Sequence, residues 1–375
     1  MMTRKFHDLT LPLLGLGAMR LPLLADGSGR VDEAETRKMV AYAMQNGLNY
    51  FDTAYPYHGG ESERIMGRIL ADYPRESYLL ATKFPSHVAA AGRSPASIFE
   101  EQLAKCGVSH FDFYLLHNVC EATTPTFLDP ELGIVDYLLK QRRLGRIRHL
   151  GFSSHGKMDN LREFLDRCGG EMAFCQIQLN YLDWTFQNAR EKYELLTSRG
   201  IPVWVMEPVR GGRLARLEAA EAAALRALNP EISPAAWALR FVKDLPNVRM
   251  VLSGMSDMAQ LRENIETFSR PDPLTSAERE ALLALAERMK NAVPCTACRY
   301  CVDGCPADLD IPMLLAAYNA FRLSASEAEP VEALPADRRP SACVACGQCV
   351  RACPQGIDVP AHLKAFAAGL ERRSR

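Results

Sequence analysis

The sequence predicts an α/β protein, with a closed (β/α)8 TIM barrel over residues 1–272 and a smaller helical domain after it. Eight short, mainly apolar runs alternate with helical segments as far as residue 254. Strands of that kind are typical of a parallel sheet that helices cover on both faces. Eight repeats favour a closed barrel over an open doubly wound sheet, and no Gly-x-Gly-x-x-Gly follows the first run.

Most neighbouring strands are separated by a segment with a helical pattern. Two of these segments begin with a serine followed by proline, Ser94 and Ser233, which is a preferred helix start. A further helix is expected within 213–229, between strands seven and eight. The other expected helices are 32–45, 94–105, 130–144, 187–198 and 233–242. The expected strands are 13–17, 49–53, 78–83, 111–117, 147–153, 174–180, 202–207 and 248–254.

Composition and charge restrict the function classes. The chain has 375 residues and a formal net charge of -1, which gives no electrostatic basis for binding nucleic acid or an anionic membrane. No apolar run approaches the roughly 18 residues that a membrane-spanning helix needs. Residues 1–14 carry positive charge and then an apolar run, as a short secretory signal does, but the following Gly15-Leu16-Gly17 fits a first strand better.

Polar side chains that can do chemistry follow three neighbouring strands. Asp52 comes after the second strand, Lys83 after the third and His117 after the fourth. Tyr57 lies on a turn just beyond Asp52, where Pro56 bends the chain. Any one of them is explained as well by a strand end that meets water. Because the carboxyl ends of barrel strands meet at one mouth, the four together predict a shared reactive pocket.

These residue types predict proton transfer to or from an oxygen atom. A free phenol has a pKa of about 10 and donates poorly at neutral pH. Lys83 is expected to stabilise the Tyr57 anion and so to lower its pKa, while Asp52 keeps the lysine charged and oriented. His117 is expected to hydrogen-bond a substrate oxygen or to assist proton transfer. No side chain delivers a hydride, so the chemistry implies a nicotinamide cofactor.

An ordered set of short motifs surrounds these residues. The motifs are Phe51-Asp52-Thr53-Ala54 with Tyr57, Gly60-Glu61-Ser62-Glu63, Ala81-Thr82-Lys83, Leu115-Leu116-His117, Gly151-Phe152-Ser153-Ser154, Gln176, Pro208 with Gly211-Gly212, and Ser253-Gly254 with Gln260 and Glu263-Asn264. On these motifs, residues 9–270 resemble the aldo-keto reductase superfamily. The resemblance implies the barrel, a catalytic tetrad of Asp52, Tyr57, Lys83 and His117, and NADP(H)-dependent reduction of a small aldehyde or ketone.

The same resemblance implies the cofactor contacts. Met206 stands where many members have an aromatic residue against the nicotinamide. Met255 and Gln260 lie where NADP-specific members offer cations to the 2′-phosphate, so NAD(H) stays open as the cofactor. Glycines 211 and 212 allow backbone amides to approach a pyrophosphate, although a plain turn explains them equally well. The implied contact residues are Ser153, Ser154, Gln176, Met206 and Pro208 near the nicotinamide, Gly211 and Gly212, and Ser253, Gly254, Ser256, Gln260, Glu263 and Asn264 on the adenine side.

Eight of the twelve cysteines form two runs after residue 294. Both runs have the spacing Cys-x2-Cys-x2-Cys-x3-Cys-Pro, which is the signature of a bacterial ferredoxin with two 4Fe-4S clusters. Structural zinc fits less well, because zinc sites close with four ligands in two pairs. The resemblance to ferredoxins implies that the fourth cysteine of each run serves the other cluster. One set would then be Cys295, Cys298, Cys301 and Cys353, and the other Cys343, Cys346, Cys349 and Cys305.

These runs define the rest of the domain plan. We expect a helical linker over 273–293 and a two-cluster domain over 294–375, with an insertion at 308–340 that contains a helix at 312–321. Clustered cysteines in a large chain indicate metal in a reducing compartment, so we expect the protein in the cytoplasm. The four scattered cysteines are expected to be packing residues.

The role of the clusters is left open by the sequence. A hydride carries two electrons, and a cluster passes one, so direct exchange needs a converter such as flavin, for which no binding pattern is present. The clusters could be structural, could sense redox state, or could link the barrel to an external ferredoxin or flavoprotein. Alternative functions are therefore an electron-transfer protein and an NAD(P)H-binding redox sensor.

Overall fold

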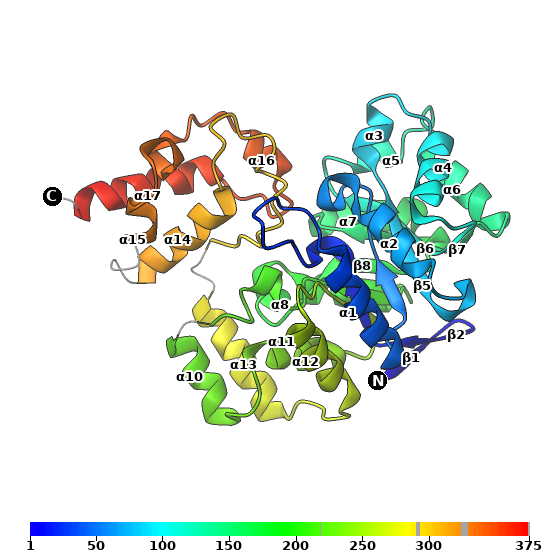
Figure 1. Ribbon diagram of the computed structural model, residues 1–375, viewed down its shortest axis with the longest axis horizontal. Helices are drawn as coiled ribbons and strands as arrows, with labels where there is room; N and C mark the ends of the chain where they lie inside the picture. Colours follow the sequence, from blue (N-terminus) through cyan, green and yellow to red (C-terminus); the bar gives the residue numbers. More distant parts are fainter. Residues whose placement is uncertain (218, 290–292, 324–328, 374–375) are drawn as a thin grey trace. The chain divides into compact units, whose positions relative to one another are not determined.

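A computed structural model describes residues 1–217, 219–289, 293–323 and 329–373 (Figure 1). The chain divides into two compact units. The barrel unit comprises Met1–Val209 and Leu214–Ala286, and the C-terminal unit comprises Arg210–Arg213 and Glu287–Arg375.

Eight parallel strands close into a barrel in the order β10-β3-β4-β5-β6-β7-β8-β9. The predicted fold class is therefore confirmed, and each barrel strand overlaps the segment expected from the sequence. Strands β3 and β10 pair to close the cylinder, with Leu14 opposite Val251. The barrel strands are β3 Leu14–Gly17, β4 Tyr50–Asp52, β5 Leu79–Phe84, β6 Phe111–Val119, β7 Ile147–Ser154, β8 Cys175–Gln178, β9 Val203–Met206 and β10 Val248–Ser253.

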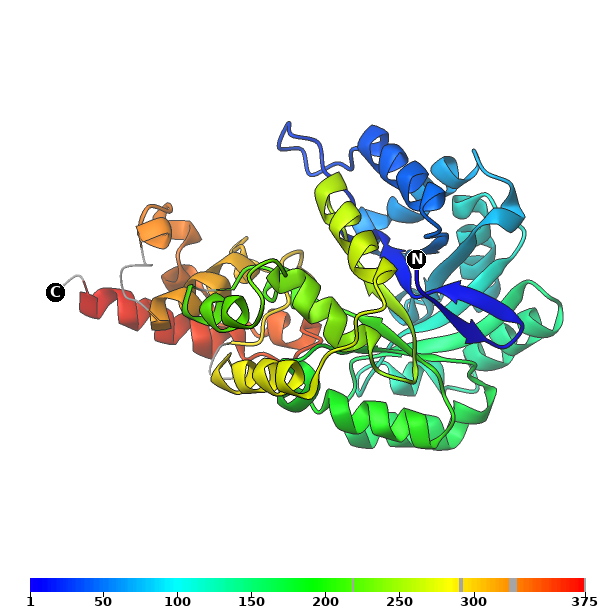
Figure 2. The same cartoon turned by 90° about the horizontal axis from the view of Figure 1, so that it is seen from below.

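A β-hairpin that the sequence did not reveal precedes the barrel (Figure 2). Strands β1 (Thr3–Phe6) and β2 (Leu9–Pro12) pair antiparallel, and His7 turns the chain between them with a φ of 49°. Phe6 and Leu11 are buried in the same core cluster as Trp204 and other barrel residues. The hairpin thus contributes to the barrel core, and the apolar run after residue 8 belongs partly to it.

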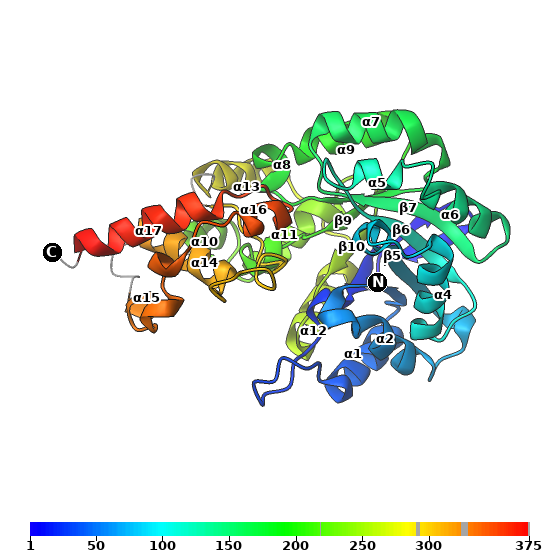
Figure 3. The ribbon, with the colours of Figure 1, turned by 90° about the horizontal axis from the view of Figure 1, so that it is seen from above.

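Helices surround the strands, as Figure 3 shows for α1, α2, α4, α6 and α7. Three of them begin where the sequence indicates, since Asp32, Ser94 and Ser233 each accept a backbone N–H of the first turn. The helices of this part are α1 Glu33–Gln45, α2 Ser62–Leu70, α3 Ser86–Ala90, α4 Pro95–Cys106, α5 Thr124–Phe127, α6 Ile134–Arg143, α7 Met158–Cys168, α8 Asp183–Phe186, α9 Ala189–Ser198, α10 Ala219–Leu228, α11 Pro234–Lys243, α12 Met258–Ser269 and α13 Ser276–Met289.

The C-terminal unit is helical. Helices α14 (Ile311–Leu323) and α17 (Val359–Arg373) lie side by side (Figure 1), accompanied by the short helices α15 (Glu329–Glu332) and α16 (Gln348–Ala352). Leu314, Leu363 and Phe366 are central to its core. Helix α13 runs through most of the expected linker, whose residues 290–292 lie outside the described part, and the domain boundaries stay predictions. No helix within the described ranges has the length and apolar character to cross a bilayer.

Candidate active site

The four residues predicted to react lie at the carboxyl ends of adjacent strands. Asp52 is the last residue of β4, Lys83 is near the end of β5, and His117 is near the end of β6. Tyr57 follows β4 as the first residue of a short 3-10 helix, Tyr57–Gly60. The backbone kinks directly after it, where His58 has a φ of 52°. The His58 Nε2 accepts the backbone N–H of Leu21 at 3.2 Å.

Lys83 is the centre of this group. Its side chain is 1% exposed, and its Nζ donates to Asp52 Oδ1 at 2.5 Å and to the backbone oxygen of Thr53 at 2.8 Å. The same ammonium lies 3.4 Å from the Tyr57 Oη. One buried cation therefore joins a carboxylate and a phenol, which is the arrangement expected of Asp52, Lys83 and Tyr57.

The pKa of Tyr57 differs from the expectation. Burial, followed by the negative charges of Asp52 and Glu207, raises the pKa of the phenol well above its usual value. Asp52 lies nearer to the ammonium than the phenol does, so the lysine charge is largely matched before it reaches Tyr57. Burial likewise raises the pKa of Asp52, although Lys83 acts in the opposite direction. In this state Tyr57 holds its proton throughout the neutral range.

His117 lies beside Tyr57. The two rings meet edge to face, with their centroids 6.1 Å apart. Burial, then the positive charge of Lys83, lowers the pKa of His117 well below its usual value. The imidazole is therefore neutral at neutral pH, with one nitrogen that donates and one that accepts. It is suited to orient an oxygen atom by a hydrogen bond, and it is not a charged acid that could supply a proton.

The residues expected at the nicotinamide lie on the next strands. Ser153 and Ser154 end β7, and Gln176 pairs with Ser153 from β8. All three are buried, and Met206 Sδ accepts the Gln176 amide at 3.5 Å. The Gln176 Oε1 is buried and has no hydrogen-bond partner in the described structure. An acceptor kept unpaired in this way suits an N–H of a nicotinamide carboxamide, so these residues fit the cofactor.

The adenine-side residues form a capped helix start. Ser253 Oγ accepts from Asn264 Nδ2 at 3.0 Å, which fastens the end of β10 to α12. Asp257 caps α12, and its carboxylate accepts the backbone N–H and the side-chain amide of Gln260 at 2.8 and 2.7 Å. The Gln260 Oε1 in turn accepts the Ser256 N–H at 3.0 Å. Gln260 is therefore engaged in capping the helix.

Five further predicted cofactor residues have fewer specific contacts in the structure. Pro208 is buried after β9, and Gly254 packs against the Arg20 side chain. Glu263 lies in the middle of α12. Glycines 211 and 212 have φ values of 62° and 96°, which explains why both are glycine. They belong to the short segment Arg210–Arg213 of the C-terminal unit, so their approach to a pyrophosphate stays a prediction.

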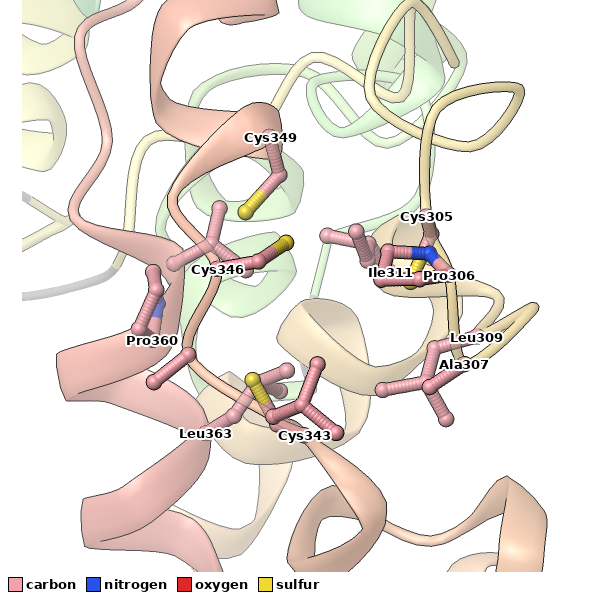
Figure 4. A pocket seen from close by; sticks show the side chains of 13 residues that line it. Cys305, Pro306, Ala307, Leu309, Ile311, Cys343, Cys346, Cys349, Pro360 and Leu363 are labelled. Carbon is pink, nitrogen blue, oxygen red and sulfur yellow. The ribbon is translucent and has the colours of Figure 1, made fainter.

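Four cysteines of the C-terminal unit lie together as the ferredoxin resemblance implies for one cluster. Cys305 joins Cys343, Cys346 and Cys349 around one cavity, with about 320 Å³ of space that is partly open to solvent. Figure 4 shows the sulfur atoms of Cys343, Cys346 and Cys349 directed toward a common space, with Cys305 on the opposite side of it. The remaining wall is apolar and includes Leu309, Val359 and Leu363.

The second group comprises Cys295, Cys298, Cys301 and Cys353. Burial, followed by the other three thiols of this group, raises the pKa of Cys301 to about 12. All twelve cysteines are free of disulfides. Four cysteine thiols are the donor set of a 4Fe-4S cluster, so the residue types of both groups fit the expected cofactor.

Comparison with known proteins identifies the larger unit. The pattern of the aldo/keto reductase family matches residues 13–287. The chain belongs to this family. Residues 294–357 match the 4Fe-4S dicluster domain, which supports iron-sulfur clusters in the C-terminal unit.

Two relatives of the aldo/keto reductase part come from a bacterium and a plant. The NADH-specific methylglyoxal reductase of Escherichia coli (strain K12) is 30% identical over 224 residues, which are 55% of this chain and 66% of that protein. The probable aldo-keto reductase 1 of Glycine max is 26% identical over 209 residues, or 53% of this chain and 56% of that protein. The chain thus spans less than two thirds of the length of these relatives.

Solved aldo-keto reductases share the fold. The holo form of one from Bacillus halodurans has a TM-score of 0.60 and 26% identity, and the match covers 76% of this chain and 96% of that one. One from Klebsiella pneumoniae, solved with NADP and acetate, has a TM-score of 0.60 and 20% identity, and the match covers 77% of this chain and 95% of that one. At this lower identity the likeness shows the fold alone.

Sequence reasoning gave no role to a buried polar network that includes Thr82, next to Lys83. Glu63 in α2 is fully buried, and its Oε1 accepts from Thr82 Oγ1 and Gln102 Nε2, both at 2.6 Å. Gln102 Nε2 also donates to the backbone oxygen of Lys83 at 3.0 Å. The available signal was a glutamine on the apolar face of α4, beside Ile98 and Leu103.

Proposed function

We propose that the protein reduces an aldehyde or ketone with a reduced nicotinamide cofactor, using Tyr57 as the proton donor. The observation that carries this proposal is the buried Lys83 ammonium, which joins Asp52 at 2.5 Å and Tyr57 at 3.4 Å. A binding module has no need of this buried charge beside a phenol. The neutral His117 next to the phenol supports the same chemistry.

Each residue has a separate task in this scheme. His117 donates a hydrogen bond to the substrate carbonyl oxygen and turns it toward Tyr57. Tyr57, which is protonated at neutral pH, transfers its proton to that oxygen as negative charge develops there. Lys83 stabilises the tyrosinate that remains, and Asp52 holds the ammonium in place. The bound cofactor supplies the hydride to the carbonyl carbon, and the product is an alcohol.

We propose NADH as the preferred cofactor. Asp257 stands at the start of α12, and its side chain is exposed. A carboxylate at this position disfavours a 2′-phosphate, and Gln260 brings no charge to offset it. The Arg20 side chain lies against Gly254 and is a cation near this loop that acts against this preference. The Escherichia coli relative, by its name, is NADH-specific.

For the clusters we propose a structural role. The core of the C-terminal unit includes Cys349 as a buried member, and Cys295, Cys301, Cys305, Cys343 and Cys353 pack against it. Binding a cluster links Cys305 to the run that begins at Cys343, across a long insertion. Such a link restricts the unfolded chain and stabilises a domain with a small core.

Electron transfer is a second candidate for the clusters. Cys346 is exposed, and its neighbour Val344 is 64% exposed, so one edge of that cysteine group is open to a partner. Anaerobic titration with NADH separates the two roles. Bleaching of the cluster absorbance by NADH, or by an added reduced ferredoxin or flavoprotein, favours electron transfer, and a spectrum that none of them changes favours a structural role.

Tyr57→Phe tests the proposed reductase activity. The variant lacks only the phenolic oxygen, so we expect loss of carbonyl reduction with nearly unchanged NADH affinity. The assay follows NADH and NADPH oxidation with methylglyoxal, other aldehydes, ketones and quinones, using anaerobically purified protein. Wild-type turnover by the variant would remove Tyr57 from the mechanism. A lower Kd for NADPH than for NADH would reject the proposed cofactor preference.

A further inference from the structure

Asn118, the residue after His117, is held in an unusual backbone conformation. Its φ is 62°, in the left-handed region. Strand pairing between β6 and β7 shifts register between Leu116 and Val119, so Asn118 lies in a bulge at the carboxyl end of β6. Its backbone N–H donates to Ser153 Oγ at 2.8 Å, and its carbonyl accepts from Thr123 Oγ1 at 2.5 Å. The backbone is thus fixed on both sides.

The side chain of Asn118 is less well satisfied than its backbone. Its Oδ1 is buried and has no hydrogen-bond partner in the described structure. Gln176 Oε1, two strands away, is in the same condition. Ser153 lies between them, as the hydrogen-bond partner of Asn118 and the register partner of Gln176. Three adjacent strands therefore carry two unpaired amide oxygens, with the Ser153 hydroxyl on the strand between them.

This set matches the hydrogen-bonding groups of a primary carboxamide, which has one acceptor oxygen and two N–H donors. Ser153 Oγ already accepts the Asn118 N–H, so its own proton is available for the carboxamide oxygen. The two amide oxygens can then accept the two N–H groups. A buried acceptor left unpaired costs free energy, and a ligand donor removes that cost.

We propose that Asn118 is a cofactor-binding residue whose amide oxygen accepts an N–H of the nicotinamide carboxamide. This inference rests on the proposed use of a nicotinamide cofactor. It adds a residue that the superfamily resemblance did not assign. It also explains why the position combines a left-handed backbone with an amide side chain, because asparagine tolerates that conformation and supplies the acceptor.

Asn118→Gly is the matched variant for a test. Glycine adopts a positive φ without strain, so the variant keeps the backbone contacts with Ser153 and Thr123 and removes only the amide. Asn188 also has a left-handed backbone, with a φ of 53°, and it begins α9. Asn188→Gly is therefore the control for the same chemical change elsewhere in the barrel unit.

The probe is a pair of reduced cofactors that differ in the group to be recognised. NADH carries the carboxamide, whereas the reduced 3-acetylpyridine adenine dinucleotide carries a methyl ketone with no N–H. Binding of each to the intact protein, with its clusters, is measured by fluorescence titration. We expect Asn118→Gly to weaken NADH binding about threefold to tenfold, the usual effect of one neutral hydrogen bond, and to leave the analogue's Kd unchanged. Asn188→Gly is expected to change neither Kd.

The outcomes separate this inference from the function on which it rests. Equal weakening of both cofactors, or no weakening of either, overturns the role of Asn118 while NADH binding by the wild type stands. A wild-type protein that binds neither NADH nor NADPH overturns the cofactor assignment and this inference together.

Discussion

The Lys83–Asp52 ion pair lies inside the barrel, with side chains that are 1% and 4% exposed. Lys83→Met removes the cation and leaves the carboxylate buried, and Asp52→Leu leaves the ammonium buried. The double variant removes both charges and substitutes apolar side chains of similar volume. The three variants therefore form a double-mutant cycle. It separates the free-energy cost of the unpaired charge that remains from the cost of losing the ion pair.

The expected magnitudes follow from the burial of this pair. Removing one partner of a buried ion pair costs about 3–5 kcal/mol, because the remaining charge has lost its counterion. Replacing both partners with apolar residues is often close to neutral, so we expect the double variant within about 1 kcal/mol of wild type. In Lys83→Met, Asp52 loses the cation that lowers its pKa, whereas the burial that raises the pKa remains. The folded state then favours protonated Asp52, so the stability of this variant is lost as pH rises through the folded pKa.

Urea unfolding followed by tryptophan fluorescence measures the effect. All three tryptophans, Trp184, Trp204 and Trp237, lie in the barrel unit, so the signal reports that unit. We expect both single variants to be strongly destabilised, Lys83→Met more at pH 8 than at pH 5, with the double variant near wild type. Carbonyl reduction should be lost in all three. Additive losses in the double variant would refute the claim that an uncompensated buried charge is the cause.

Three further predictions concern titration and packing. The rate of carbonyl reduction should not change with pH from about pH 6 to about pH 9, because Tyr57 keeps its proton and His117 stays neutral. A change of slope in the pH–rate profile near pH 7 would contradict the pKa directions of both residues. Gly67→Ala should destabilise the barrel unit by about 1–3 kcal/mol in urea unfolding despite alanine's helix preference, since a Cβ there meets the Lys105 and Cys106 carbonyl oxygens at 2.7 Å. Burial raises the pKa of Glu63 in the folded state, so the free energy of unfolding of wild type should exceed that of Glu63→Gln most at low pH. This difference should shrink as pH rises through the folded-state pKa of Glu63, and a constant difference from pH 4 to about pH 8 would argue against a buried carboxylate.

The barrel could be predicted because its signals are local. A covered parallel strand is a mainly apolar run, and a helix start such as Ser94-Pro95 is visible in two letters. The hairpin was not predicted, because its strands β1 and β2 have four residues each and the second merges with the apolar run that enters β3. Its identity depends on packing against distant residues such as Trp204.

The tetrad could be located from the sequence, but its electrostatics could not. Strand ends indicate which residues share a mouth, and hence the meeting of Lys83 with Asp52 and Tyr57. The pKa direction of Tyr57 depends on burial and on Glu207, whose charge acts from another strand end. The sequence shows that Lys83 is present, but it does not show how deeply Tyr57 is buried. For the same reason the motif that contains Glu63 was visible, while its hydrogen bonds to Thr82 and Gln102 were not.

The two units meet different physical demands, and this bears on the role of iron. The barrel unit has a large core and holds its reacting groups with buried ion pairs and hydrogen bonds. In the described part of the C-terminal unit, the buried core is a small cluster around Leu314, Leu363 and Phe366, and cysteines complete it. Removing the clusters should therefore destabilise the C-terminal unit, whereas the Lys83–Asp52 pair does not depend on metal. Because a hydride moves two electrons together and a cluster one at a time, carbonyl reduction needs no electron from iron, and a structural role for the clusters is compatible with full activity of the barrel.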